Sequence, residues 1–247
     1  MISVFADVYD HLMADINYIS WAEFYSRIMS RNGIHPGAEI VECACGTGGL
    51  TIPLKRLGYR ITGLDINEDM LRVAADKTRA EGLLIPYVNM DMCDLCLHHA
   101  VDAVLCTCDG VNYLTSADEV LRFYTKAASA IKPGGCFIFD ISSHYKLSGL
   151  LANHLVVNDT DKLTYIWDSH YHAGTKRCEI ALTIFIKEKD NRYIRIDEQQ
   201  IQRAHTLTEI TAWLAAAGFQ SPPEILGEFG LAAVKKHDLR QHIIARK

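Results

Sequence analysis

The sequence predicts an α/β protein with a doubly wound, Rossmann-like and mostly parallel sheet of seven strands, of which the last is antiparallel. Three observations predict this fold class. Apolar, strand-like runs alternate with amphipathic helical segments over residues 38–142. A glycine-rich turn, Gly46-Thr47-Gly48-Gly49, follows the first of these runs. The same rhythm resumes over residues 206–247, after a stretch with a different pattern.

The elements of the alternating region are taken in chain order. Strands are expected at 39–44, 60–65, 85–90, 103–107 and 136–141, and helices at 50–57, 68–80 and 117–131. Pro133-Gly134-Gly135 should end the helix expected at 117–131. A final helix is expected at 206–217, and two last strands at 224–229 and 241–245. Ligands of such sheets bind beyond the carboxyl ends of the strands, at 45–48, 65–66, 91–92 and 106–112 here.

The chain divides into a core and an insertion. Residues 143–205 contain a period-two pattern that predicts an inserted antiparallel β-sheet, which should cover the substrate. The core would then comprise residues 1–142 and 206–247. Residues 5–31 indicate one or two amphipathic helices, either packed on the core or forming a lid. In a lid, Tyr9, Tyr18 or Trp21 would cover a cationic cofactor.

Composition narrows the function. The 247 residues carry a formal charge of −5, which disfavours nucleic acid as a substrate. There is no apolar run of the roughly 20 residues needed to cross a bilayer, and acids interrupt the apolar N-terminus, so neither a membrane span nor a signal peptide is expected. Eight cysteines without a secretory signal indicate reduced thiols and a cytoplasmic protein. The spacing of zinc sites occurs only once, so no metal is expected.

The ligand signals favour a nucleoside with a small charged tail. Gly46 and Gly48 allow a tight turn and a close approach of a ligand to the main chain. Asp65 ends the second strand, where an acid can accept both hydrogens of a ribose diol, and Asp91 ends the third, within reach of a purine. Thr51 stands where a dinucleotide fold would have its third glycine, and no triphosphate-binding loop occurs.

A family resemblance rests on four motifs: VECACGTGGLTIPL, GLDINEDML, VNMDMCDL and IKPGGCFIFD. Together they resemble the motif series of class I S-adenosylmethionine-dependent methyltransferases over about residues 38–142. The insertion and the aromatic N-terminal segment are similar to the small-molecule N-methyltransferase branch, which includes glycine and amino-sugar enzymes. They also resemble uncharacterised bacterial relatives that share the patterns YDxLM and CDxxNYL.

The resemblance implies a cofactor, S-adenosyl-L-methionine, and roles for particular residues. Gly46 and Gly48 would line its methionine part, Glu42 would steady that end, and Asp65 would hold the ribose. Asp91 and Met92 would hold the adenine, and the end of the fourth strand would face cofactor and acceptor. The full set of expected cofactor residues is Tyr9, Tyr18, Trp21, Glu42, Ala44, Gly46, Gly48, Asp65, Ile66, Met70, Asp91, Met92, Thr107 and Cys108. Relatives often carry a histidine where this chain has Gln200, so that histidine cannot act here.

Methyl transfer from a sulfonium requires alignment, exclusion of water and, for some acceptors, removal of a proton. Asp109 is the first candidate for a proton acceptor, although it could instead shape the loop with Gly110. His144 and Tyr145 come next, or form a hinge into the insertion.

The predicted function is methyl transfer to a small polar molecule at N or O. The alternatives are a nicotinamide-dependent oxidoreductase and an S-adenosylmethionine-binding protein without turnover.

Overall fold

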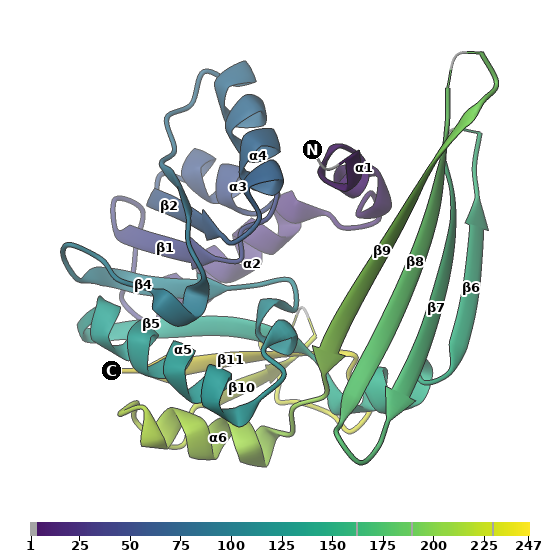
Figure 1. The fold of residues 1–247 in the computed structure, drawn as a ribbon. Coiled ribbons are helices and arrows are strands. Elements are labelled where there is room, and N and C mark those ends of the chain that lie inside the picture. The colour runs from purple at the N-terminus through teal and green to yellow at the C-terminus, as the bar shows by residue number, and fades with distance from the viewer. Residues whose placement is uncertain (1–3, 162, 189, 229) are drawn as a thin grey trace.

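Seven strands form one mixed sheet in the computed structural model, which describes residues 4–161, 163–188, 190–228 and 230–247. Their order is β10-β11-β5-β4-β1-β2-β3, and β11 runs antiparallel to both of its neighbours (Figure 1). The bounds are β1 (Glu39–Cys43), β2 (Arg60–Asp65), β3 (Tyr87–Asn89), β4 (Val101–Cys106), β5 (Ile131–Ser142), β10 (Glu224–Gly227) and β11 (Arg240–Arg246). The predicted fold class is confirmed.

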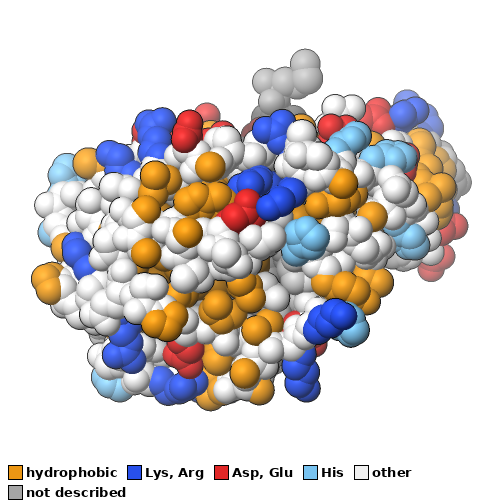
Figure 2. Space-filling model, turned by 90° about the horizontal axis from the view of Figure 1, so that it is seen from below, with side chains coloured by type: hydrophobic (Ala, Val, Ile, Leu, Met, Phe, Trp, Pro, Cys, Tyr) orange, Lys and Arg blue, Asp and Glu red, His pale blue; other side chains and the backbone are white. Residues whose placement is uncertain are grey.

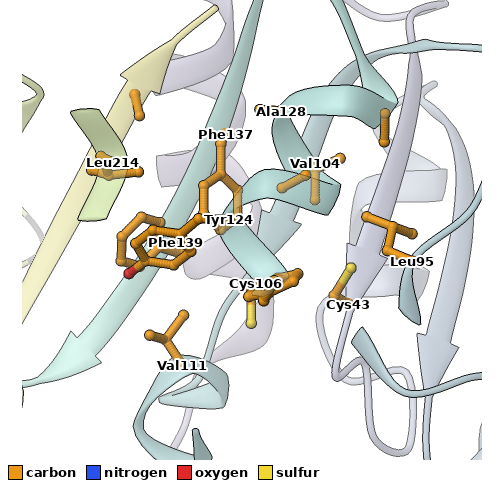
Figure 3. Close-up of a cluster of buried hydrophobic side chains, with 14 of the residues drawn as sticks. Cys43, Leu95, Val104, Cys106, Val111, Tyr124, Ala128, Phe137, Phe139 and Leu214 are labelled. Carbon is orange, nitrogen blue, oxygen red and sulfur yellow. The ribbon is translucent and has the colours of Figure 1, made fainter. Parts of the chain in front are cut away.

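Helices cover both faces of this sheet, which explains why its strands are apolar on both sides. α2 (Tyr18–Arg31) and α3 (Thr51–Arg56) pack on one face, with α4 (Glu68–Ala80) beside α3. α5 (Ala117–Ala130) and α6 (Leu207–Ala216) pack on the other face. There, Phe137 and Phe139 of β5 stack at 4.7 Å between ring centroids and lie against Tyr124 and Leu214 (Figure 3). Ile138, between them in sequence, joins the core of the opposite face.

The insertion forms a separate antiparallel sheet in the order β6-β7-β8-β9. Its strands are β6 (His154–Asp159), β7 (Leu163–His172), β8 (Arg177–Lys187) and β9 (Tyr193–Arg203). Ile180, Leu182 and Ile184 are buried on one face of β8, as the alternation predicted. Helix α1 (Val4–Leu12) lies between this sheet and α4, with Phe5 in the same apolar cluster as Leu182 and Met70 (Figure 1).

A few local predictions differ from the structure. Ile131, expected to end a helix, is extended (φ −94°, ψ 140°) and begins β5, which continues through Pro133-Gly134-Gly135. The start of the insertion, for which no helix or strand was predicted, holds a π-helix, η3 (Lys146–Leu150). The predicted end of a strand at Phe229 lies outside the described residues.

The described helices are all too short or too polar to cross a bilayer. On the face of the molecule seen from below, basic, acidic and apolar side chains are interspersed (Figure 2).

Candidate active site

A cavity of about 430 Å³ opens at the carboxyl ends of β1, β2 and β4. This volume is in the range of about 300–1,000 Å³ that is typical of small-molecule sites. Tyr9 of α1 and Gln200 of β9 contribute to its other walls, so the cavity lies between the mixed sheet and the insertion. The sequence predicted a ligand at this edge of the sheet.

The turn after β1 forms the floor of the cavity. Ala44, Gly46 and Gly48 have positive φ angles of 54°, 54° and 75°, a region that glycine occupies without steric cost. A Cβ on Gly48 would lie 2.8 Å from the Tyr87 hydroxyl, so this position also needs glycine for space. Within the turn, the N–H groups of Cys45 and Gly48 donate to the carbonyls of Leu64 and Cys45, so these bonds fix the shape of the floor.

Asp65 joins the ends of β1 and β2. One carboxylate oxygen accepts the Gly46 N–H at 2.7 Å, and the other accepts the Asn67 N–H at 2.9 Å. Burial raises the pKa of Asp65, and these main-chain donors oppose that shift. Each oxygen keeps lone-pair capacity for one more donor, so the carboxylate can accept two hydrogens from a ligand in the cavity.

Glu42 of β1 is the most deeply buried acid that lines the cavity, with 2% of its surface exposed. Its carboxylate accepts hydrogen bonds from the hydroxyls of Thr51 (2.6 Å) and Thr107 (3.1 Å). No described cation pairs with it, and burial raises its pKa to about 7. Glu42 therefore changes its charge near neutral pH.

Helix α1 is attached to the glycine turn by polar contacts. The Asp10 carboxylate accepts the Thr47 hydroxyl at 2.6 Å and pairs with Lys77 of α4 at 2.6 Å. Tyr9 and Tyr18 both line the cavity, and neither hydroxyl hydrogen-bonds to another described residue. Burial raises the pKa of both tyrosines, so their hydroxyls stay protonated and can donate to a ligand.

The loop after β4 is held by a buried charge network. Cys108 and Asp109, both with positive φ, donate their N–H groups to the Asp140 carboxylate at 2.9 Å each. Arg240 of β11 bonds to both Asp140 and Asp109, and its guanidinium lies 4.9 Å from the ring centroid of Trp21. The network fixes the loop that forms one wall of the cavity.

This network bears on the predicted role of Asp109 as a proton acceptor. Burial alone would raise the pKa of Asp109, but Arg240 and Lys146 outweigh it and hold that pKa below its usual value. A carboxylate so stabilised is a weak base. Asp109 does not line the cavity, so the geometry favours the alternative in which it shapes the loop.

Strand β9 forms the wall of the cavity that faces the glycine turn across the open space. Residues 198–201 line it, and the Tyr113 hydroxyl donates to the Gln200 side-chain oxygen at 2.9 Å. Nearby, the amide of Asn112 bonds to Ser142 and to the carbonyl of Arg203 at 2.9 Å, which ties the insertion to β5. The Asn112 amide is thus already occupied by main-chain partners.

Most of the predicted cofactor residues meet at the cavity. Those that line it are Tyr9, Tyr18, Glu42, Ala44, Gly46, Asp65, Ile66, Met70, Met92, Thr107 and Cys108.

Three predicted cofactor residues lie outside the lining. Trp21 is buried, 7% exposed, beneath Arg240. Gly48 borders a second, smaller hollow between α1, α3 and α4. Asp91 uses its side chain to accept the Cys93 N–H at 2.8 Å at the start of the short helix η1 (Met92–Asp94).

His144 and Tyr145, the other predicted catalytic candidates, also lie outside the lining. His144 is exposed and its ring nitrogen lies 3.1 Å from the Ser148 hydroxyl. The Tyr145 ring packs against His237 at 4.8 Å between centroids. Their positions favour the alternative reading of a hinge into the insertion.

Several lining residues were not anticipated. Phe5 and Asn67 follow from the positions of α1 and of the turn after β2. Glu198 is the lining acid that the sequence analysis missed. Its signal was the register of β9, where Glu198 shares the inward face with Ile196 and Gln200.

Comparisons with known proteins show which class of protein the chain is similar to. A model of the methyltransferase domain matches residues 40–135. The chain is 29% identical, over 98% of both sequences, to a protein of Geobacillus sp. (strain WCH70) whose name places it among the methyltransferases. The crystal structure of an S-adenosylmethionine-dependent methyltransferase from Clostridium acetobutylicum ATCC 824 matches with a TM-score of 0.89 and 27% identity, covering 98% of this chain and 97% of that one. A sugar N-methyltransferase from Streptoalloteichus sp. ATCC 53650 shares the fold, with a TM-score of 0.76 and 22% identity, over 97% and 93% of the two chains.

The mixed sheet, the cavity over its glycine turn and these matches define the class: the chain is a methyltransferase with a Rossmann-like fold. Within that class it is an S-adenosylmethionine-dependent enzyme, as its motif series indicated. These matches set aside the nicotinamide-dependent alternative.

Proposed function

We propose that this enzyme methylates a small polar molecule, at nitrogen or oxygen, inside the cavity between the glycine turn and β9. When bound, S-adenosylmethionine supplies a methyl group on a sulfonium, a good leaving group that an acceptor lone pair displaces in line. The observation that carries the proposal is that a single cavity joins the proposed cofactor floor, Gly46 and Asp65, to a second polar wall, Gln200 and Tyr113.

The residues present fit this cofactor. Asp65 has a free acceptor site on each oxygen, which matches the two hydroxyls of a ribose. Glu42 supplies a carboxylate for a cationic end, and the Tyr9 and Tyr18 rings offer aromatic faces to a sulfonium. Met92 and Ile66 add apolar surface for a base. These roles of the lining residues in binding the cofactor are part of the proposal.

The chain's own contribution to catalysis is to align the acceptor and exclude water. Helix α1, fixed by Asp10 to Thr47 and Lys77, closes one side. The inserted sheet closes the other, and in this proposal it is the subdomain that covers the substrate. The Arg240 network keeps the loop at 107–113 in place behind the reacting groups.

Cofactor affinity should depend on pH through Glu42. Its pKa of about 7 in the ligand-free protein means that it is largely protonated below neutrality. A cationic cofactor end beside it favours the ionised form and lowers that pKa, so binding requires loss of a proton at acidic pH. We expect the affinity for S-adenosylmethionine to fall by up to about tenfold per pH unit below 7 and to level off above it.

Isothermal titration between pH 5.5 and 8.5 measures this dependence, and Glu42→Gln is the control. In that variant the profile should be flat over the same range. A wild-type profile that matches the variant's would remove Glu42 from the cofactor end.

The direct test of the function is an assay with S-adenosylmethionine carrying a labelled methyl group and a small-molecule cell extract as acceptor. A labelled small product, identified by mass, is the expected result. If label enters only nucleic acid or protein fractions when these are supplied, the small-molecule proposal is wrong.

A further inference from the structure

Glu198 is a carboxylate on an otherwise apolar or neutral face. Along β9 the residues that point inward alternate with exposed ones, and Glu198 shares the inward face with Ile196 and Gln200. Its cross-strand neighbour on β8 is Leu182, which is 4% exposed. The acid therefore points at the cavity and at α1 rather than at open water.

Nothing in the described part of the chain neutralises this acid. Glu198 makes no ion pair and no side-chain hydrogen bond with any described residue, and burial raises its pKa with no cation to oppose the shift. Its neighbour Asp197, on the outer face, has partners: its carboxylate accepts hydrogen bonds from the Arg195 guanidinium and from the Thr183 hydroxyl. A half-buried carboxylate without a donor is costly unless a ligand provides one.

The charge of the cavity lining also favours a cationic ligand beside Glu198. Its acids are Glu42, Asp65 and Glu198, and its described lining contains no lysine, arginine or histidine. Glu42 and Asp65 are already bonded to threonine hydroxyls and main-chain N–H groups on the cofactor side. Glu198 lies on the opposite wall, where the acceptor would enter. An acceptor with a carboxylate or phosphate at this wall would meet like charge with no compensating cation.

We infer that Glu198 binds the acceptor, and that the acceptor presents a protonated amine to it. This inference rests on the proposed function, and it narrows the class of methyl acceptor from small polar molecules to amines. In the reaction, Glu198 takes one proton from the ammonium group, which frees the nitrogen lone pair. The nitrogen then forms a bond to the methyl carbon as the carbon–sulfur bond breaks, and that electron pair stays on sulfur. The positive charge passes from sulfur to the methylated nitrogen, and the proton on Glu198 returns to solvent.

The first test compares two portions of one small-molecule cell extract as acceptor. One portion is treated with N-hydroxysuccinimidyl acetate, which converts primary and secondary amines to neutral amides. We expect labelled methyl product from the untreated portion and a loss of at least tenfold in the treated one. Equal product in both portions would overturn the amine assignment and leave methyl transfer intact.

The second test uses variants of neighbouring residues on opposite faces of β9. Glu198→Gln should lower kcat/KM for the labelled product by at least tenfold, mainly through KM, while its affinity for S-adenosylhomocysteine stays within twofold of wild type. Glu198→Asp should recover part of the loss. Asp197→Asn, on the outer face, is the matched control and should behave as wild type.

A third test measures binding of the acceptor under conditions in which no methyl group can be transferred. Protein loaded with S-adenosylhomocysteine is dialysed against the untreated extract, and retained compounds are identified by mass. Wild type and Asp197→Asn should retain an amine that Glu198→Gln does not. Retention of the same compounds by all three proteins would overturn the role of Glu198. Absence of any methylated small molecule from the untreated extract would instead contradict the proposed function and the inference with it.

Discussion

Arg240→Met is expected to lower the free energy of unfolding by about 3–5 kcal/mol, the usual cost of removing one partner from a buried ion pair. The guanidinium is the cation shared by Asp109 and Asp140, whose side chains are 17% and 0% exposed. Without it, two buried carboxylates face each other, and Lys146, 4.0 Å from Asp109, offsets only part of their charge. Asp140 also accepts the Tyr25 hydroxyl at 2.5 Å, so the damage should spread to α2.

Urea denaturation followed by circular dichroism measures this loss. Arg195→Met is the matched control, because Arg195 forms a solvent-exposed pair with Asp197 and its removal should leave the denaturation midpoint unchanged within error. Equal midpoints for Arg240→Met and wild type would show that the network does not stabilise the fold.

Asp65→Ala is expected to weaken cofactor binding by about 1–3 kcal/mol, or roughly 5- to 150-fold in Kd. The substitution removes both acceptor oxygens proposed for the ribose, and it also releases the Gly46 N–H from its partner. Asp65→Asn keeps one acceptor oxygen and should lose less. Titration calorimetry with S-adenosylhomocysteine gives the affinities.

Asp76→Asn is a suitable control for this series, since Asp76 lies on α4 in exposed pairs with Arg72 and Arg79. Its affinity should equal that of wild type. An Asp65→Ala protein that is folded and binds with unchanged affinity would take Asp65 out of the site.

The fold and the cofactor side of the site were predictable because their signals are local. Buried parallel strands are apolar runs, and their carboxyl ends meet at one edge of the sheet. The bounds of β2 and α4 therefore match the expectation from sequence. Asp65, Gly46 and Glu42 lie within or directly after such runs, so they meet at the cavity.

The acceptor side was not predictable because it depends on contacts between distant residues. Asp109 follows a strand as a catalytic acid could, but its partner Arg240 is 131 residues away in the chain. No sequence pattern shows that pairing. For Glu198, the period-two pattern shows that it shares one face of a strand with Ile196 and Gln200. The pattern does not show that this face lines the cavity, which depends on where β9 is placed.

The most direct measurement is a crystal structure of the enzyme with S-adenosylhomocysteine. The account predicts that the ribose hydroxyls lie within hydrogen-bond distance of the Asp65 carboxylate and that the amino-acid end lies beside Glu42 and the 44–48 turn. An adenosine bound elsewhere, or with its ribose turned away from Asp65, would contradict it.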